Sequence, residues 1–124
     1  MRVLIADDNR DVVDSLGLLI EGTGREVFRA YDSVDALLLC TEKKPEVIVL
    51  DLRMPGPSGV DVCRSIRATD WGQRACIASL SAWADDEYGT QANRGEFDAF
   101  FLKPLEWKVL SDWLTHVAEH GRNK

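Results

Sequence analysis

The stretch 47-VIVLDLRMPGPSG-59 decides the fold class and directs attention to one carboxylate. Val47 to Leu50 are aliphatic residues, three of them β-branched, and they predict a short strand covered on both faces of a sheet. The run ends on Asp51, and a turn rich in proline and glycine follows it. A buried strand therefore ends in a single acid at the start of a loop. This position suggests that Asp51 has a chemical role.

Composition places the chain among ordinary globular proteins. Its 124 residues, 45% hydrophobic and 29% charged, suit one domain with a hydrophobic core. We expect a cytoplasmic protein with no membrane contact, because no apolar run approaches about 20 residues and no signal peptide is recognisable. The net charge of -6 argues against direct nucleic-acid binding by this chain. Cys40, Cys63 and Cys76 are odd in number and widely spaced, which favours buried, reduced thiols.

Short apolar runs alternate along the chain with amphipathic segments. The predicted strands are residues 3–6, 26–30, 47–50, 75–80 and 99–102. The predicted inner helix faces are Val12, Val13, Leu16, Leu19 and Ile20; Val34, Leu37, Leu38 and Thr41; Val60, Cys63 and Ile66; and Leu110, Trp113, Leu114 and Val117. A helix over residues 84–94 is the weakest, with few large apolar residues and an interior Gly89. Strict alternation predicts an α/β protein, a three-layer α/β/α sandwich around a five-stranded parallel sheet.

Polar residues follow four of these five strands. They are Asp7 and Asp8 after the first, Asp51 at the end of the third, Ser81 after the fourth and Lys103 after the fifth. Parallel strands place their carboxyl ends at one edge of the sheet, where such folds bind ligands. We therefore expect three carboxylates, a hydroxyl and an ammonium group to share one site.

This set of groups favours phosphoryl transfer to a carboxylate. Clustered acids without histidine or cysteine favour a hard cation, and Mg²⁺ is the predicted cofactor. An aspartate can carry a phosphoryl group as an acyl phosphate, while a lysine and a hydroxyl stabilise its oxygens. Helix capping is the alternative for Asp7, Asp8 and Asn9, since such residues are common at helix N-termini. Capping explains neither Asp51 nor Lys103.

Four stretches of the sequence resemble the receiver domain of two-component response regulators. They are VLIADDNRDVVDSL (3–16), VIVLDLRMPGPSGVDV (47–62), ASLSAW (78–83) and FDAFFLKPL (97–105). The resemblance covers essentially the whole chain, and it implies a single receiver domain over residues 1–124 with the flavodoxin-like strand order 2-1-3-4-5. These stretches are similar to the receiver domains of hybrid sensor kinases and to single-domain regulators.

The resemblance also implies a phosphorelay function. Asp51 would become a 4-aspartylphosphate, taking its phosphoryl group from a histidine kinase or a histidine phosphotransfer protein. Ser81 and Lys103 would contact the phosphoryl oxygens. Such a chain is a signalling phosphoacceptor that catalyses only its own phosphorylation and autodephosphorylation, and it is not an enzyme acting on other substrates. Its output would pass to a downstream protein effector through the fourth helix, fifth strand and fifth helix, with a homodimer as a further option.

Further positions receive roles only through this resemblance. Asp8 would bind Mg²⁺ directly, Asp7 mainly through water, and the backbone carbonyl of Arg53 would supply another ligand. The peptide bond between Lys103 and Pro104 would be cis.

More than one role is open for the residues that would take part in the conformational switch or set the lifetime of the phosphorylated state. The resemblance implies that Phe100 reports the switch by turning inward, whereas the alternative is a permanently buried ring. Ser81 replaces the commoner threonine. Trp83 is bulky for its position, so we hypothesise that Trp83 and Arg53 restrict the attacking water and slow dephosphorylation. Alternatively, Trp83 packs on the fourth helix or contacts a partner.

Three other classes compete with this interpretation. A flavodoxin-like electron carrier would cradle a phosphate in its first loop, where Asp7 and Asp8 would repel that anion. A haloacid-dehalogenase-like phosphatase would need a second acid two residues after Asp51, and this chain has Arg53 there. A degenerate receiver, acting only as a protein-interaction module, would usually have lost one of the acids or the lysine, and all are present.

Overall fold

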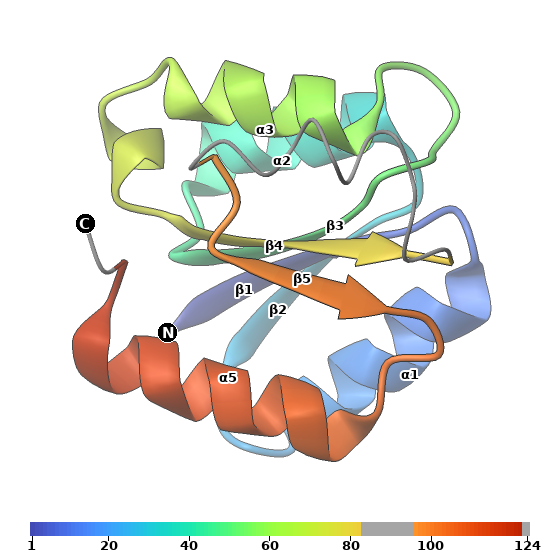
Figure 1. The fold of residues 1–124 in the computed structure, drawn as a ribbon, viewed down its shortest axis with the longest axis vertical. Helices are drawn as coiled ribbons and strands as arrows, with labels where there is room; N and C mark the ends of the chain where they lie inside the picture. Colours follow the sequence, from blue (N-terminus) through green and yellow to red (C-terminus); the bar gives the residue numbers. More distant parts are fainter. Residues whose placement is uncertain (83–95, 123–124) are drawn as a thin grey trace.

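A parallel sheet forms the centre of the molecule (Figure 1). The computed structural model describes residues 1–82 and 96–122. The strands are β1 (Arg2–Ala6), β2 (Glu26–Ala30), β3 (Val47–Asp51), β4 (Cys76–Ser81) and β5 (Ala99–Leu102), in the order β2-β1-β3-β4-β5. All four strand pairings are parallel, which confirms the predicted sheet and its strand order.

Helices cover both faces of this sheet. They are α1 (Arg10–Glu21), α2 (Ser33–Lys43), α3 (Gly59–Arg67) and α5 (Trp107–His120), with a short 3₁₀ helix, η1, at Trp71–Gln73. Helices α2 and α3 lie on one face, and α1 and α5 lie on the other (Figure 1). None of the helices in the described part of the chain is long and apolar enough to cross a membrane.

Strand β3 is buried throughout because it contributes to two separate cores. Ile48 and Leu50 belong to the core beneath α2 and α3, while Val47 and Val49 belong to the core beneath α1 and α5. This arrangement explains the uninterrupted apolar run read from the sequence. Asp51 follows on the same strand, and it is therefore held by the most deeply buried strand of the sheet.

The inner faces of two helices differ from the sequence prediction. In α2 the buried residues are Ser33, Ala36 and Cys40, whereas Val34 and Leu38 are 55% and 62% exposed. The predicted face of α2 was therefore wrong, because small side chains turn towards the sheet and allow a close approach of the helix. The larger apolar residues are left outside.

Helix α1 shows a related departure at one position. Leu19 was predicted on the inner face but is 44% exposed. The buried position is instead Gly17, over which the side chain of Arg29 lies. A Cβ atom at Gly17 would come within 2.6 Å of Arg29 Nη2, so the glycine provides the space for this arginine. The predicted helix over residues 84–94 lies outside the described residues.

Candidate functional site

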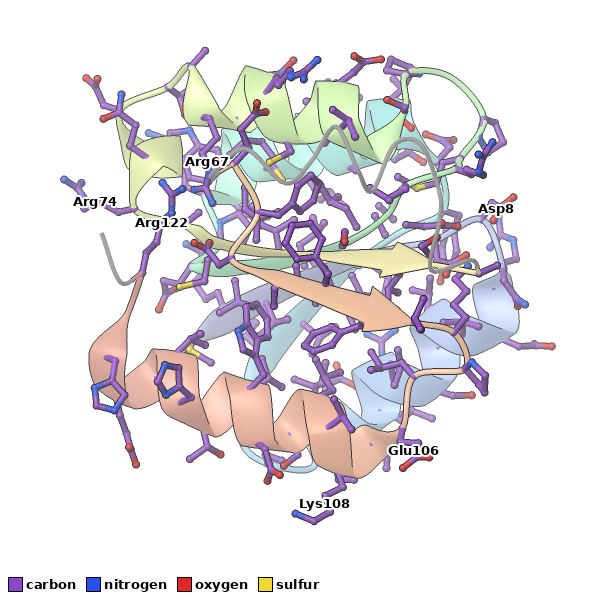
Figure 2. The ribbon with its side chains drawn as sticks, viewed as in Figure 1. Asp8, Arg67, Arg74, Glu106, Lys108 and Arg122 are labelled. Atoms are coloured by element: carbon purple, nitrogen blue, oxygen red, sulfur yellow. The ribbon has the colours of Figure 1, made fainter. Side chains whose placement is uncertain are left out.

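The carboxyl ends of the central strands bring the predicted acids together. One carboxylate oxygen from each of Asp7, Asp8 and Asp51 lies within 4.8 Å of the others. Asp7 is fully buried and Asp51 is 4% exposed, whereas Asp8 faces solvent at this edge of the molecule (Figure 2). The parallel sheet thus produces the cluster that the strand ends predicted.

Lys103 joins the two buried acids. Its Nζ lies 2.8 Å from Asp7 Oδ2 and 3.1 Å from Asp51 Oδ2. The backbone N–H of Lys103 donates to the carbonyl of Ser81 at 2.8 Å, which sets the start of the loop after β5. Ser81 is itself buried as the last residue of β4. The next peptide bond, between Lys103 and Pro104, is cis.

The backbone around Asp51 holds its carboxylate in place. The N–H of Arg53 donates to Asp51 Oδ1 at 3.1 Å, and the N–H of Leu52 donates to the carbonyl of Leu80 at 3.0 Å. The first residue of α3, Gly59, packs directly against this turn. A Cβ atom at Gly59 would lie 2.5 Å from the carbonyl oxygen of Asp51, so a glycine is needed for the close approach. Sequence reasoning did not single out Gly59, although its place after Ser58, the N-cap of α3, was a usable signal.

Burial and charge change the acid–base properties of the site. Desolvation and the neighbouring Asp7 carboxylate raise the pKa of Asp51 to about 6, although the Arg53 N–H and Lys103 act in the opposite direction. At Lys103, burial favours the neutral amine, but the contacts with Asp7 and Asp51 outweigh it and raise the pKa of the ammonium group. At neutral pH the site therefore holds an ionised Asp51 beside a charged Lys103.

The donor set fits a hard cation such as Mg²⁺. The side chains that could hold the ion are those of Asp7, Asp8 and Asp51, whose carboxylate oxygens are the type of ligand that it prefers. Oδ2 of Asp7 is buried and accepts no aligned hydrogen bond in the described part of the structure, despite its ion pair with Lys103. Three carboxylates beside one ammonium group leave negative charge in excess, which a bound cation would offset. The capping alternative holds for Asn9 only, whose side chain accepts from the N–H groups of Asp11 and Val12.

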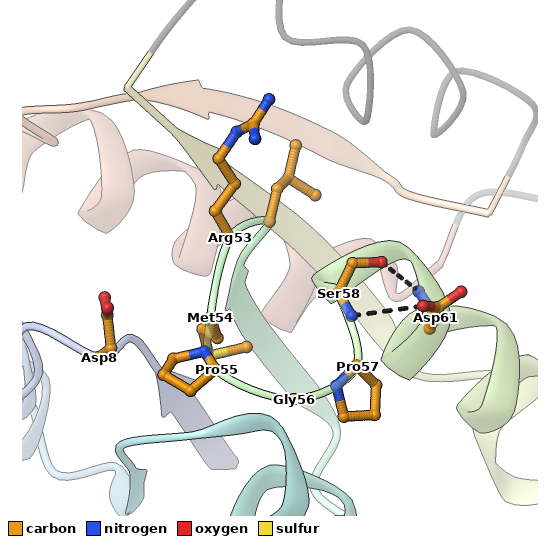
Figure 3. A pocket seen from close by; sticks show the side chains of 9 residues that line it. Asp8, Arg53, Met54, Pro55, Gly56, Pro57, Ser58 and Asp61 are labelled. Atoms are coloured by element: carbon orange, nitrogen blue, oxygen red, sulfur yellow. Dashed lines mark hydrogen bonds between the residues drawn. The ribbon is translucent and has the colours of Figure 1, made fainter.

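A pocket of about 520 Å³ opens beside the acids, between Asp8 and the loop after β3 (Figure 3). Its wall includes Arg53 and the turn residues that lead to α3. At its far side Ser58 and Asp61 form a capping box, in which each accepts from the backbone N–H of the other (Figure 3). This box fixes the beginning of α3 and thereby one wall of the pocket. Asp8, the exposed acid of the cluster, lines the same pocket.

Of the two aromatic residues that were expected to act in switching or tuning, the structure describes Phe100. Phe100 is 48% exposed on β5, and its ring centroid lies 5.9 Å from that of Phe97. The alternative of a permanently buried ring at this position was therefore wrong. Trp83 lies outside the described residues.

A partly buried ion-pair network, which the sequence did not reveal, lies at the opposite edge of the sheet. Asp98 accepts from the guanidinium groups of Arg67 and Arg122, each at 2.9 Å, and from the N–H of Ile77. Figure 2 shows Arg67 and Arg122 close together and far from Asp8. The network joins α3, β4, the start of β5 and the chain after α5, so it supports the fold at the end remote from the acids.

Comparison with known sequences identifies the family. The sequence model of the response regulator receiver domain matches residues 3–115. The transcriptional regulatory protein PrrA of Mycobacterium tuberculosis is 38% identical over 117 residues, which are 94% of this chain and 48% of PrrA. The DNA-binding response regulator MtrA of Mycobacterium leprae is 28% identical over 109 residues, 88% of this chain and 47% of MtrA. The chain thus spans about half the length of these relatives.

Solved structures agree on the fold. A CheY-like receiver domain protein from Methanospirillum hungatei superposes with a TM-score of 0.89 at 19% identity, covering 96% of this chain and 94% of that one. A DNA-binding response regulator of the LuxR family from Staphylococcus aureus gives a TM-score of 0.84 at 25% identity, covering 94% and 97%. With the acids, the lysine and the fold in place, this chain belongs to the response regulator receiver domain family, whose members signal in two-component systems.

Proposed function

We propose that this protein accepts a phosphoryl group on Asp51 from a histidine kinase or a histidine phosphotransfer protein. The observation that carries the proposal is the placement of Asp51 at the end of the central strand, 3.1 Å from Lys103 and inside a cluster of acids. Residues 1–124 would act as one receiver domain. The degenerate receiver remains the competing function, and the intact set of acids and lysine counts against it.

The reaction would use Asp51 as the nucleophile. Its pKa of about 6 leaves the carboxylate ionised at neutral pH, so one oxygen can attack the phosphorus of a phosphohistidine. The P–O bond to Asp51 forms as the P–N bond breaks, and the departing imidazole takes up a proton. Lys103 would pair with a phosphoryl oxygen and the hydroxyl of Ser81 would donate to another.

Asp7, Asp8, Asp51 and the backbone carbonyl of Arg53 would hold a Mg²⁺ ion. When bound, the ion would supply positive charge that offsets the charge of the phosphoryl oxygens. Lys103 already neutralises part of the charge of the two buried acids, and it would remain available to the phosphoryl group.

Signal output would use the surface near β5 and α5. Phe100, Leu102 and Val109 are exposed apolar residues there, and Phe100 and Leu102 alternate on β5 with the half-buried Phe101. We propose that phosphorylation draws Ser81 towards the phosphoryl group and that Phe100 turns inward in response. The changed surface would then bind a downstream protein effector or a second copy of the chain.

Arg53 and Trp83 would set the lifetime of the phosphorylated state. Arg53 borders the pocket beside the acids, where its side chain can restrict the approach of water. We expect Arg53→Ala and Trp83→Ala each to shorten the phosphoryl half-life, measured as loss of the phosphorylated mass with time. An unchanged half-life in both variants would contradict this role.

The direct test incubates the protein with Mg²⁺ and acetyl phosphate and records the intact mass. Wild-type protein should gain one phosphoryl group, and Asp51→Asn should gain none. Asp112→Asn removes an exposed acid of α5 outside the cluster, so this matched control should behave as wild type. If wild-type protein gains nothing from acetyl phosphate or from a phosphohistidine donor, the degenerate receiver is favoured instead.

A further inference from the structure

Two histidines on α5 form a pair that the phosphoacceptor site does not use. They are His116 and His120, the only two histidines of the chain, separated by one helical turn. Both side chains are exposed, and their ring centroids lie 4.6 Å apart with an angle of 42° between the ring planes. Residues four apart on a helix share one face, so both imidazoles are presented to the same volume of solvent.

The spacing of the rings suits chelation of one metal ion. Imidazole nitrogens bind Zn²⁺ at about 2.0–2.1 Å in tetrahedral geometry, which would place two coordinating rings with centroids roughly 5 Å apart. The observed separation of 4.6 Å is close to that value, so side-chain rotation could bring a nitrogen of each ring to one ion while the helix keeps its position. We propose that His116 and His120 form a binding site for a divalent transition-metal ion of the Zn²⁺ class.

The surroundings of the pair favour a cation. Glu119 Oε2 lies 3.8 Å from His120 Nε2, so a carboxylate adds negative charge beside the pair. Asp112 lies one turn before His116 on the same face, where it pairs with Lys108 at 3.0 Å. The site is also at the C-terminal end of α5, whose carbonyl groups carry the negative end of the helix dipole.

Cysteines and acids elsewhere in the described residues differ from this pair in their metal-binding chemistry. Burial raises the pKa of the thiols of Cys40 and Cys63 to about 12, so they are not thiolates in the folded protein. The acids near Asp8 lie at the opposite edge of the molecule from Arg122, which follows His120 by two residues (Figure 2). Those oxygen ligands favour Mg²⁺, whereas imidazole favours the transition metals.

The test titrates the protein with Zn²⁺ by calorimetry while excess Mg²⁺ occupies the acid cluster. Wild-type protein should bind one Zn²⁺ per chain. His116→Ala and His120→Ala should each weaken binding by at least about tenfold, because a single imidazole loses the chelate advantage. Glu119→Gln should weaken binding by a smaller factor.

A spacing variant provides the matched control. Thr115→His combined with His116→Ala keeps two histidines but places them five residues apart, and it should bind as weakly as His116→Ala alone. Equal affinity in this variant and in wild type would overturn the proposal, as would Zn²⁺ binding that persists in the variant lacking both histidines. A stoichiometry of two chains per ion would contradict a site built on one chain. The Zn²⁺ titration requires no phosphorylation of Asp51, so its result is independent of the proposed function.

Discussion

Replacing the acceptor acid should stabilise the protein. In the absence of Mg²⁺, Asp51→Asn removes a charge that is buried at the end of β3 and lies in the same cluster as Asp7. Lys103 still pairs with Asp7 after the substitution, so no buried charge is left unpaired. We therefore expect a higher free energy of unfolding for Asp51→Asn than for wild type at neutral pH.

The pKa of Asp51 gives the size and the sign of this effect. It rises from 3.8 to about 6 on folding, and each pKa unit corresponds to about 1.4 kcal/mol. Between these values the folded state holds a proton that the unfolded state has released, so stability falls as the pH rises from about 4 to about 6 and is flat above. Asp51→Asn should thus gain at most about 3 kcal/mol at pH 7.5 and nothing near pH 4.

Urea denaturation at both pH values, with and without Mg²⁺, measures this difference. Saturating Mg²⁺ should stabilise wild type but have a weaker effect on Asp51→Asn, so the gap should narrow. Asp112→Asn, which removes an exposed charge, should stay within about 0.5 kcal/mol of wild type under every condition. A lower unfolding free energy for Asp51→Asn at pH 7.5 without Mg²⁺ would refute the electrostatic reasoning.

Two further substitutions test the fold that supports the site. Asp98→Ala should lower the unfolding free energy by about 1–3 kcal/mol, because it removes the carboxylate that the partly buried Arg67 and Arg122 share; a loss below about 0.5 kcal/mol in urea denaturation would contradict this. Gly59→Ala should destabilise by about 1–3 kcal/mol and slow phosphorylation by acetyl phosphate, since its Cβ would lie 2.5 Å from the Asp51 carbonyl oxygen. Wild-type stability and rate in Gly59→Ala would show that the turn adapts.

The sheet and the acids could be predicted from the sequence because their signals are local. The buried run ending at Asp51 and the alternation of Glu26–Ala30 each lie within five residues, and the matching strands are found in the structure. Parallel pairing then places Asp7 and Lys103 beside Asp51 without further information. Most of the candidate site therefore follows from one rule, that parallel strands have their carboxyl ends at the same edge of the sheet.

Other features depend on partners that are distant in the sequence. Arg67 and Asp98 are 31 residues apart, and nothing in either segment indicates their ion pair. The inner face of α2 was mispredicted because apolar size favoured Val34 and Leu38, whereas a close approach to the sheet requires small residues such as Ala36. Tertiary packing determines which residues pair and which helix face is buried, and the periodicity of the sequence does not show that packing.

The position of the phosphoryl group tests the central claim most directly. Borohydride reduction of the protein after treatment with acetyl phosphate and Mg²⁺ converts an acyl phosphate of aspartate to homoserine, which peptide mass spectrometry can locate. We predict the mark at Asp51 alone, and its loss when Mg²⁺ is removed. A mark at Asp7 or Asp8, or an equal yield of phosphorylated protein from Asp51→Asn, would contradict the assignment of Asp51 as the acceptor.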